Sequence, residues 1–258
     1  MMADTKVIAV IPARWSSSRF PGKPLALIQG KPMIQWVYEQ ASKTKCVSEL
    51  IVATDDSRIL DTVNGFGGKA VMTSSDHESG TDRIAEVIRD INCEVVVNVQ
   101  GDEPLIPPSN IDLIVKPLLE GISQSTVTLR IPIKSHKELL DRNITKVVVD
   151  KFDQALYFSK APIPWDRDNN GINSSVDHLK PFWYKHIGLY AYKKSFLMEF
   201  SSLPESNLEK IEKLEQLRIL ENGHGIKVVE TDLDSIGVDS ESDLALIEER
   251  LAEQSVLP

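Results

Sequence analysis

Short apolar runs and amphipathic segments alternate along the first part of the chain. The apolar runs, typical of strands buried on both faces of a sheet, lie at residues 7–11, 50–54, 70–72 and 94–99. Segments with apolar residues at helical spacing lie between them, at residues 32–44, 56–64 and 81–90. This order predicts a parallel sheet covered by helices on both sides, with ligands bound beyond the carboxyl ends of its strands.

The pattern changes after about residue 125. Four closely spaced stretches there read as strands and predict an added antiparallel section over about residues 125–200: TVTLRIPI, TKVVVD, QALYFSK and FWYKHIGLYAY. Further on, the pattern predicts a helix at residues 207–222, a strand at 226–230, and a helix from residue 239 or 240 to about 254.

Charged residues interrupt the apolar face of the helix predicted at 207–222. Its buried arc is expected to hold Leu208, Ile211, Leu214, Leu217 and Ile219, yet Glu215 and Arg218 fall inside the same arc. Unpaired burial of either charge is costly, and at a spacing of three the two can pair with each other. Alternatively the helix lines a cavity and offers polar groups to a hydroxyl-rich ligand, with Gln216 at its edge.

Composition narrows the class of protein. A chain of 258 residues with 41% hydrophobic residues suits one α/β domain, with room for a smaller lobe. Cys46 and Cys93 form no CxxC motif, which favours a reducing compartment, and we expect a cytoplasmic protein. We expect neither a signal peptide nor a membrane-spanning helix, and a net charge of −9 argues against a partner that is a nucleic-acid polymer or a membrane.

The loop after the first strand, PARWSSSRFPGK, concentrates cations in this acidic chain. Arg14 and Arg19 can each hold phosphate oxygens in a bidentate manner, and Lys23 adds a point charge after the turn formed by Pro21 and Gly22. The loop therefore predicts an anion site, although it does not match the Walker A pattern. The alternative is a solvated loop whose cations pair with surface carboxylates.

Two aspartates follow apolar stretches at places where a metal could bind. Asp102 comes directly after the strand at 94–99, and Asp239 precedes the last predicted helix. Both also fit a structural role, since Asp102 suits a turn and Asp239 suits a helix N-cap. Two carboxylates together with a phosphate chain would make a suitable Mg²⁺ site.

Other polar positions are weaker candidates. In TSSDHESGTDR, Ser79 or Thr81 could cap the helix that follows, and His77 could either contact a ligand or be merely exposed. In YKHIGLYAY, alternation places His186, Gly188 and Tyr190 on one strand face, which suits a ligand-facing surface. Arg167 could hold a carboxylate, and the aromatic-rich strands also suit a dimer interface.

Seven ordered stretches carry a resemblance that spans nearly the whole chain: IPARWSSSRFPGKPL, HESGTDR, VNVQGDEP, ALYFSKAPIPWDRD, HIGLYAY, KLEQLR and GVDSESDL. Together they resemble the 3-deoxy-manno-octulosonate cytidylyltransferase (CMP-Kdo synthetase) family of lipopolysaccharide synthesis. The resemblance implies a nucleotidyltransferase-type α/β fold over residues 1–258: a mixed, mostly parallel sheet flanked by helices, with a smaller antiparallel dimerisation lobe at about 125–200 that also binds sugar. It implies a homodimer, and a reaction in which CTP and Kdo give CMP-Kdo and pyrophosphate with Mg²⁺ as cofactor.

The resemblance also implies roles for residues at matching positions. Arg14, Arg19 and Lys23 would hold the CTP phosphates, and with Asp102 they would be catalytic; Asp102 and Asp239 would bind magnesium. Ser79 and Gly80 would lie near the nucleotide, and Gln100 near both nucleotide and sugar. The sugar pocket would be lined by Arg167, His186, Tyr190, Glu215 and Gln216. Trp15 and Ser16–Ser18 lie in the variable part of the loop and are expected to be filler, and residues 168–183 match no motif.

Two other functions remain open at this point. One is CTP-dependent activation of another 2-keto sugar acid such as sialic acid, or a related nucleotide-sugar pyrophosphorylase. The other is a nucleotide-binding module without turnover. The stretches PWDR, HIGLY and KLEQLR favour Kdo over the first, and the retained aspartates and loop cations argue against the second.

Overall fold

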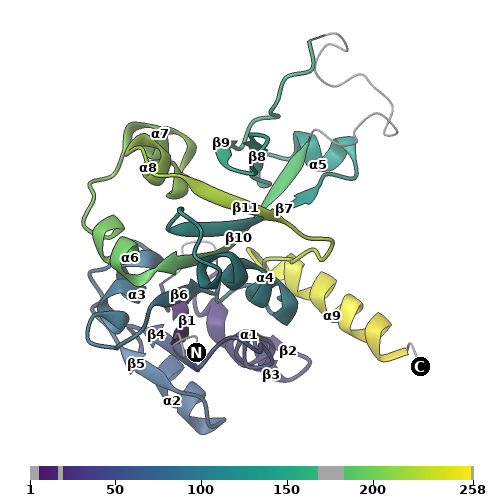
Figure 1. Cartoon of the computed structure of the whole chain (residues 1–258). Coiled ribbons are helices and arrows are strands. Elements are labelled where there is room, and N and C mark those ends of the chain that lie inside the picture. Colours follow the sequence, from purple (N-terminus) through teal and green to yellow (C-terminus); the bar gives the residue numbers. More distant parts are fainter. Residues whose placement is uncertain (1–5, 17–19, 168–182, 257–258) are drawn as a thin grey trace.

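The protein is seen here as a computed structural model that describes residues 6–16, 20–167 and 183–256. Within this part of the chain a nine-stranded sheet has the order β11-β7-β10-β6-β1-β4-β5, with β8 paired to β10 and β9 to β8 (Figure 1). Its strands are β1 (Val7–Ala13), β4 (Glu49–Thr54), β5 (Ala70–Met72), β6 (Val95–Asn98), β7 (Thr126–Pro132), β8 (Lys146–Val149), β9 (Ala155–Ser159), β10 (Tyr184–Lys193) and β11 (Ile226–Glu230).

The sheet is mostly parallel, as the sequence predicts. Strands β6, β1, β4 and β5 pair in parallel, and so do β7 and β11. Strand β10 runs antiparallel to both β6 and β7 and so joins the two parallel groups. Strands β8 and β9 add the smaller antiparallel section beside β10, which confirms the predicted fold class.

Helices cover both faces of the sheet and enclose two cores. One core packs α1 (Met33–Ala41), α2 (Ser57–Gly65) and α4 (Pro108–Leu119) against one face of the sheet. The other packs α3 (Gly80–Ile88), α6 (Lys194–Phe200) and α8 (Gln216–Glu221) against the opposite face. Consecutive residues of β1 alternate between the two cores, which explains why its whole run is apolar.

A third cluster fixes the C-terminal helix, α9 (Glu241–Val256). Ile247 of α9 and the preceding Val238 pack on Met33 and on Ile28 of the small hairpin formed by β2 (Leu27–Ile28) and β3 (Lys31–Pro32). Glu248 also accepts a hydrogen bond from the Gln29 backbone at 2.9 Å. This helix therefore ties the last part of the chain to the loop that follows β1.

The sequence spacing predicted one continuous helix at 207–222, and this prediction is wrong. The structure has two short helices, α7 (Asn207–Glu212) and α8, because Lys213 adopts a left-handed conformation with φ 55°. The two halves therefore do not share one continuous helical face, and Ile211, in α7, is 79% exposed instead of buried. Three further helices have no counterpart in the sequence prediction: α4, α5 (His136–Leu140) and α6. Helix α4 begins at Pro108 and contains Pro117, residues that usually mark loops and helix ends.

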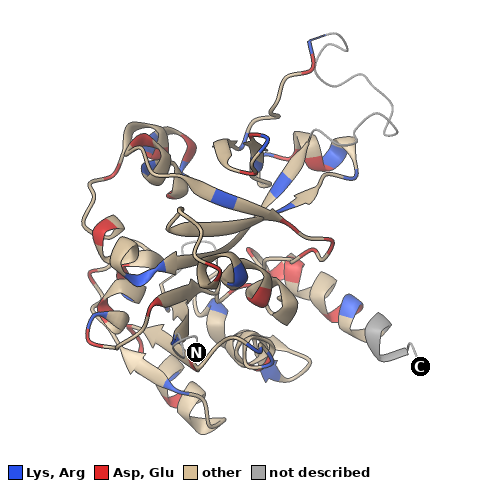
Figure 2. Ribbon diagram, viewed as in Figure 1, with Lys and Arg blue, Asp and Glu red and all other residues tan. Residues whose placement is uncertain are grey.

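None of the described helices is long and apolar enough to span a membrane. Charges of both signs are interspersed over the described helices and strands, as Figure 2 shows. The cations of the loop after β1 are therefore a local feature of a chain whose net charge is −9.

Candidate active site

A pocket of about 350 Å³ lies at the sheet edge where β1 and β6 end. Its walls come from the loops that follow these strands, from the start of α3 and from the segment before α9. It is lined by Pro12, Ala13, Arg14, Lys23, Pro24, His77, Glu78, Ser79, Gly80, Arg83, Gln100, Gly101, Asp102 and Asp239. The structure thus brings together seven of the predicted site residues: Arg14, Lys23, Ser79, Gly80, Gln100, Asp102 and Asp239.

Glycines let the loops around this pocket approach each other closely. A Cβ atom at Gly101 would lie 2.8 Å from the carbonyl oxygen of Pro12, and one at Gly80 would lie 3.2 Å from the Pro12 ring. Larger residues at these positions would push the loops apart. The two glycines therefore bring the end of β1, the backbone that follows β6 and the start of α3 around one small volume.

The loop after β1 is braced by an aromatic side chain. Gly22 adopts a left-handed conformation with φ 72°, and its backbone N–H donates to the Trp15 carbonyl at 3.0 Å. The Trp15 ring lies against Gly22, and the Arg58 guanidinium lies over the ring at 3.3 Å from its centroid. The expectation that Trp15 is filler was therefore wrong, because this ring supports the turn that presents Lys23. Arg19 lies outside the described residues.

Lys23 links the two predicted metal ligands. Its ammonium donates to the Asp102 carboxylate at 2.7 Å and to the Val238 carbonyl at 2.7 Å, and it lies 3.8 Å from the Asp239 carboxylate. Helix α9 begins at Glu241, two residues after Asp239. Backbone N–H groups of Asp239 and Ser240 both donate to Asp243 at 2.8 Å, so the Asp239 segment is held by its backbone while its carboxylate lies near Lys23.

These two carboxylates suit magnesium better than a metal held by protein ligands alone. The described residues contain no group of three or more His, Cys, Asp and Glu side chains that could hold a metal ion. Mg²⁺ is usually bound by one or two carboxylates, with water and substrate phosphates as its other ligands. Asp102 and Asp239 gathered around one cation at a pocket edge fit this pattern.

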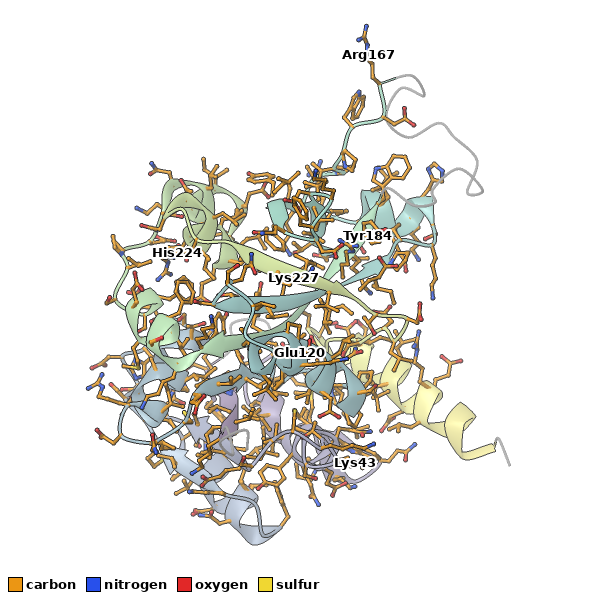
Figure 3. All side chains as sticks on the ribbon, in the orientation of Figure 1. Lys43, Glu120, Arg167, Tyr184, His224 and Lys227 are labelled. Atoms are coloured by element: carbon orange, nitrogen blue, oxygen red, sulfur yellow. The ribbon has the colours of Figure 1, made fainter. Side chains whose placement is uncertain are left out.

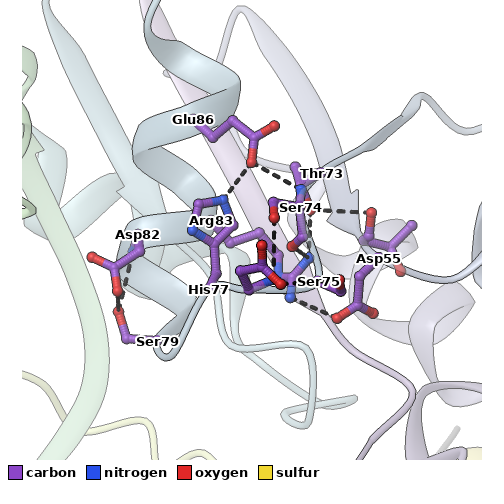
Figure 4. A network of polar contacts seen from close by, with 11 residues as sticks. Asp55, Thr73, Ser74, Ser75, His77, Ser79, Asp82, Arg83 and Glu86 are labelled. Carbon is purple, nitrogen blue, oxygen red and sulfur yellow. Dashed lines mark hydrogen bonds and ion pairs between the residues drawn. The ribbon is translucent and has the colours of Figure 1, made fainter.

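Arg83 anchors the loop between β5 and α3, and the sequence prediction missed it. This residue is buried and donates to Asp55 at 2.8 Å and to the Ser74 carbonyl at 3.3 Å (Figure 4). In the same network Glu86 accepts hydrogen bonds from the Ser74 backbone and from His77. Arg83 ends the HESGTDR stretch directly before the apolar position Ile84, which was the available signal.

The first turn of α3 connects this pocket to the partly buried carboxylate of Glu215. Ser79 is the N-cap of α3, accepting a hydrogen bond from the Asp82 backbone at 3.1 Å. Thr81, two residues on, donates through its hydroxyl to Glu215 Oε2 at 2.7 Å. Burial raises the pKa of Glu215, and the hydrogen bonds from Thr81 and Ser79 partly offset that rise.

Glu215 keeps one buried carboxylate oxygen, Oε1, without a hydrogen-bond partner among the described residues. Its distance from Arg218 is 3.9 Å, whereas Arg218 donates to Glu209 at 2.6 and 2.8 Å. The ion pair considered from the sequence is thus long, and Glu209 is the main partner of Arg218. Gln216 is buried directly beside Glu215, as the first residue of α8.

Strand β10 presents the predicted sugar-facing residues on one face. The pairing of β10 with β7 is irregular between Ile187 and Tyr190, yet the rings of His186 and Tyr190 remain neighbours, with centroids 5.4 Å apart. Between them, a Cβ atom at Gly188 would lie 4.0 Å from the Gln100 side chain. Because Gln100 lines the pocket, the face carrying His186 and Tyr190 continues from it.

Burial sets the protonation of both ring residues. It lowers the pKa of His186 to about 3, with a smaller contribution from the charge of Lys160. The Thr128 hydroxyl lies 2.9 Å from both the Leu189 carbonyl and His186 Nε2, which favours a neutral imidazole with its proton on Nε2. Burial, followed by the nearby Glu215 charge, raises the pKa of Tyr190 well above its usual value. The Tyr190 hydroxyl has no hydrogen-bond partner among the described residues.

The structure does not bring Arg167 to the pocket. It is exposed on the segment after β9, and Figure 3 shows its side chain projecting away from the sheet. Its assignment to the sugar pocket therefore stays a prediction.

Comparisons with known proteins agree with this arrangement. The family described as "Cytidylyltransferase" matches residues 8–231. The chain is 54% identical to the 3-deoxy-manno-octulosonate cytidylyltransferase of Syntrophotalea carbinolica, over 95% of this chain and 98% of that protein. It is 52% identical to the protein of the same name from Geobacter sulfurreducens, over 95% of this chain and 99% of that protein.

Solved structures give the same result. A CMP:2-keto-3-deoxy-manno-octonic acid synthetase complexed with CTP superposes with a TM-score of 0.89 at 42% identity, covering 97% of this chain and 100% of that one. A 4-diphosphocytidyl-2C-methyl-D-erythritol synthase from Anaerococcus prevotii shares the fold alone, with a TM-score of 0.61 at 14% identity over 97% of this chain and 98% of that chain. The chain belongs to the cytidylyltransferase family and, within it, to the 3-deoxy-manno-octulosonate cytidylyltransferases.

Proposed function

We propose that this protein transfers CMP from CTP to Kdo, giving CMP-Kdo and pyrophosphate for lipopolysaccharide synthesis. One observation supports this most directly. The pocket at the ends of β1 and β6 contains cations and two aspartates, and it adjoins a surface where buried polar atoms lack hydrogen-bond partners among the described residues. A structure of a relative with CTP bound superposes closely on the chain.

The nucleotide is proposed to bind in the pocket, between the loop after β1 and the start of α3. Arg14, Arg19 and Lys23 would neutralise the triphosphate, while Ser79, Gly80 and Gln100 would lie along the nucleoside part. Lys23 is already oriented toward Asp102, and the Trp15 ring supports the turn before it. Such preorganised charge contributes strongly where negative charge develops in a transition state.

The sugar is proposed to bind on the adjoining face, against Gln100, His186, Tyr190, Glu215 and Gln216, with Arg167 as a more distant candidate. Glu215 Oε1 and the Tyr190 hydroxyl are buried without partners among the described residues, and sugar hydroxyls would satisfy them. The proton on His186 Nε2 leaves Nδ1 as an acceptor for a further hydroxyl.

In the proposed reaction, the anomeric hydroxyl of Kdo attacks the α-phosphorus of CTP in line. A P–O bond forms to the sugar, the bond to the bridging oxygen breaks, and pyrophosphate leaves. Mg²⁺ bound by Asp102 and Asp239 would neutralise phosphate charge and lower the pKa of the attacking hydroxyl. The residues of the chain position both substrates and supply fixed charge around the phosphates.

Pyrophosphate release from CTP tests this proposal. We expect turnover with Kdo, and little with N-acetylneuraminic acid or with UTP in place of CTP. Equal turnover with the sialic acid would mean that Kdo is not the specific substrate. Binding of CTP without turnover of any sugar acid would mean that the protein is a nucleotide-binding module and not an enzyme.

The aspartate assignment has its own test. Asp102→Asn is expected to lower kcat by about 100-fold or more at saturating Mg²⁺, because it removes one negative charge from the proposed ligand pair. The melting temperature should stay within a few degrees of wild type. Asp61→Asn, on the exposed face of α2, is the matched control and should leave kcat unchanged. An unchanged kcat for Asp102→Asn would remove the metal role.

We further propose a cytoplasmic homodimer that pairs through the antiparallel section. Exposed apolar side chains gather on its elements and on the adjoining α7: Phe152, Leu156, Trp165 and Ile211, each at least 61% exposed. Sedimentation equilibrium should report a dimer for wild type and for Met72→Lys, on the edge strand β5, but a monomer for Leu156→Lys. A dimer that persists in Leu156→Lys would place the interface elsewhere.

A further inference from the structure

The segment that carries Asp239 has no secondary structure of its own. After β11 ends at Glu230, the chain crosses the end of the sheet and forms no helix or strand until Glu241. An extended segment of this kind is positioned by the contacts that its residues make with neighbouring loops. The location of Asp239 relative to Asp102 therefore depends on those contacts.

Hydrogen bonds fix the beginning and the end of this segment. At its start, Asn110 of α4 accepts from the Thr231 hydroxyl at 2.7 Å and donates to the Leu233 carbonyl at 2.9 Å. At its end, the Val238 N–H donates to the Asp102 carbonyl at 2.8 Å, and the Val238 carbonyl accepts from Lys23 at 2.7 Å. Both backbone groups of Val238 are thus used to bring the segment to the pocket.

The middle of the segment is held by a buried carboxylate. Glu103, the residue next to Asp102, accepts a hydrogen bond from the Ser235 hydroxyl at 2.6 Å. Only 9% of Glu103 is exposed, so its side chain points into the protein, away from solvent. Beside this pair, Lys185 of β10 forms an ion pair with Asp234 at 2.6 Å.

The chemistry of Glu103 calls for an explanation. A buried carboxylate costs free energy unless it is hydrogen-bonded, and an apolar residue could fill the same space. Here its partner lies on the segment without secondary structure that carries Asp239, a proposed metal ligand. A hydrogen bond from Ser235 fixes the position of this segment as well as satisfying the carboxylate.

We propose that Glu103 and Ser235 form a positioning pair that holds Asp239 opposite Asp102 and so sets the affinity of the site for a divalent cation. The inference rests on the proposed function, because it takes Asp102 and Asp239 as the metal ligands. Neither member of the pair touches the metal: Glu103 acts through Ser235 on the segment, and the segment carries Asp239. Residues that orient metal ligands commonly change metal affinity by 10-fold or more when they are replaced.

Mn²⁺ binding in the presence of CTP, followed by electron paramagnetic resonance, tests the pair without relying on turnover. Ser235→Ala is expected to weaken Mn²⁺ binding by about 10-fold. Ser235→Thr keeps the hydroxyl and Glu103→Gln keeps the acceptor, and both should bind Mn²⁺ within about three-fold of wild type. Ser202→Ala, in the exposed turn after α6, is the matched control and should not differ from wild type.

A merely structural role predicts a different result. In that case Ser235→Ala would lower the melting temperature and leave the Mn²⁺ affinity of the folded protein unchanged, which would overturn the proposal. Glu103→Met removes the acceptor and is expected to weaken Mn²⁺ binding about as much as Ser235→Ala, and the double variant of Ser235→Ala with Glu103→Met should bind no more weakly than either single variant, because both changes break one contact. Additive losses would mean that the two residues act separately, and would also overturn it.

Mn²⁺ binding distinguishes a wrong assignment of the metal ligands from a wrong assignment of the positioning pair. If Asp102→Asn binds Mn²⁺ as tightly as wild type, the ligand assignment is wrong and the positioning role falls with it. If Asp102→Asn weakens Mn²⁺ binding and Ser235→Ala does not, the assignment of the metal ligands is kept and only the positioning role of Glu103 and Ser235 is wrong.

Discussion

Glu215 shows how a single residue can be suited to a ligand and not to the stability of the free protein. Its pKa is raised by burial, and one of its oxygens lacks a partner among the described residues. For an acid whose folded pKa is raised, stability is largest at low pH and is lost as the pH rises through the folded pKa. At neutral pH the ionised form therefore disfavours the folded state.

Glu215→Gln is expected to separate these two effects. Removing the charge should raise the melting temperature of the free protein by about 1–3 °C at pH 8. The same variant should raise the KM for Kdo about 10-fold or more and change the KM for CTP much less, because the amide is a poorer acceptor for sugar hydroxyls. Calorimetry measures the melting temperature, and pyrophosphate release gives the two KM values.

Glu199→Gln, an exposed carboxylate on α6, serves as the control for loss of one charge. If Glu215→Gln instead lowered the melting temperature and raised both KM values alike, Glu215 would be a structural residue.

At the scale of elements, the break between α7 and α8 determines where Glu215 lies. Glu209 caps α7 through Ser206 and also forms the ion pair with Arg218 of α8, so one side chain fixes both helices. Lys213, between them, is in the left-handed conformation that ends α7. Glu215 is held in place by this joint and by its hydrogen bond from Thr81.

Glu209→Ala should destabilise the protein by about 3 kcal/mol, because it leaves the Arg218 guanidinium buried without its main partner. Denaturant unfolding measures the change. Lys210→Ala, the exposed neighbour on the same helix, should change stability by less than about 0.5 kcal/mol. A loss below about 1 kcal/mol in Glu209→Ala would mean that solvent or another group replaces the pair.

The same elements show what sequence could and could not predict. Apolar runs predicted the strands β1, β4 and β6, because buried parallel strands need them, and the short edge strand β5; the periodic helices α1 to α3 were equally visible. The loop cations and aspartates could then be predicted as site residues, because the carboxyl ends of parallel strands share one edge of the sheet. Backbone conformation at Lys213 and the prolines of α4 carried no such pattern, so the two short helices and α4 were missed. Trp15 and Arg83 were missed because their partners, Arg58 at the start of α2 and Asp55 in the loop before it, are distant in sequence.

At the scale of the whole molecule, one pocket draws its walls from residues 12 to 239. Its formation therefore requires β1, β6 and α3 to pack together with the segment before α9. Changes of pH that charge a partly buried group in this region should be seen in global stability.

His186 provides the clearest case. Its folded pKa of about 3 lies below the value of 6.5 for a free imidazole, so its stabilising effect is fully present above pH 6.5 and is lost as the pH falls toward 3. Relative to His186→Gln, we expect wild type to lose about 1–2 kcal/mol of unfolding free energy between pH 7 and pH 5. Denaturant unfolding at both pH values gives the difference. Parallel curves for the two proteins would mean that His186 is protonated as readily in the folded state as in the unfolded chain.

Side chains along β10 alternate between the two faces of the sheet, so substitutions on the two faces should have different consequences. Ile187, Leu189 and Ala191 pack into the core on one face, whereas His186, Gly188 and Tyr190 lie on the face that adjoins Gln100. Selection for a different sugar acid could therefore act on His186 and Gly188, whereas Tyr190 also packs in the second core and the odd-numbered positions pack in the first. A library that randomises only His186 and Gly188 should yield more folded variants than one that randomises Ile187, Leu189 and Ala191.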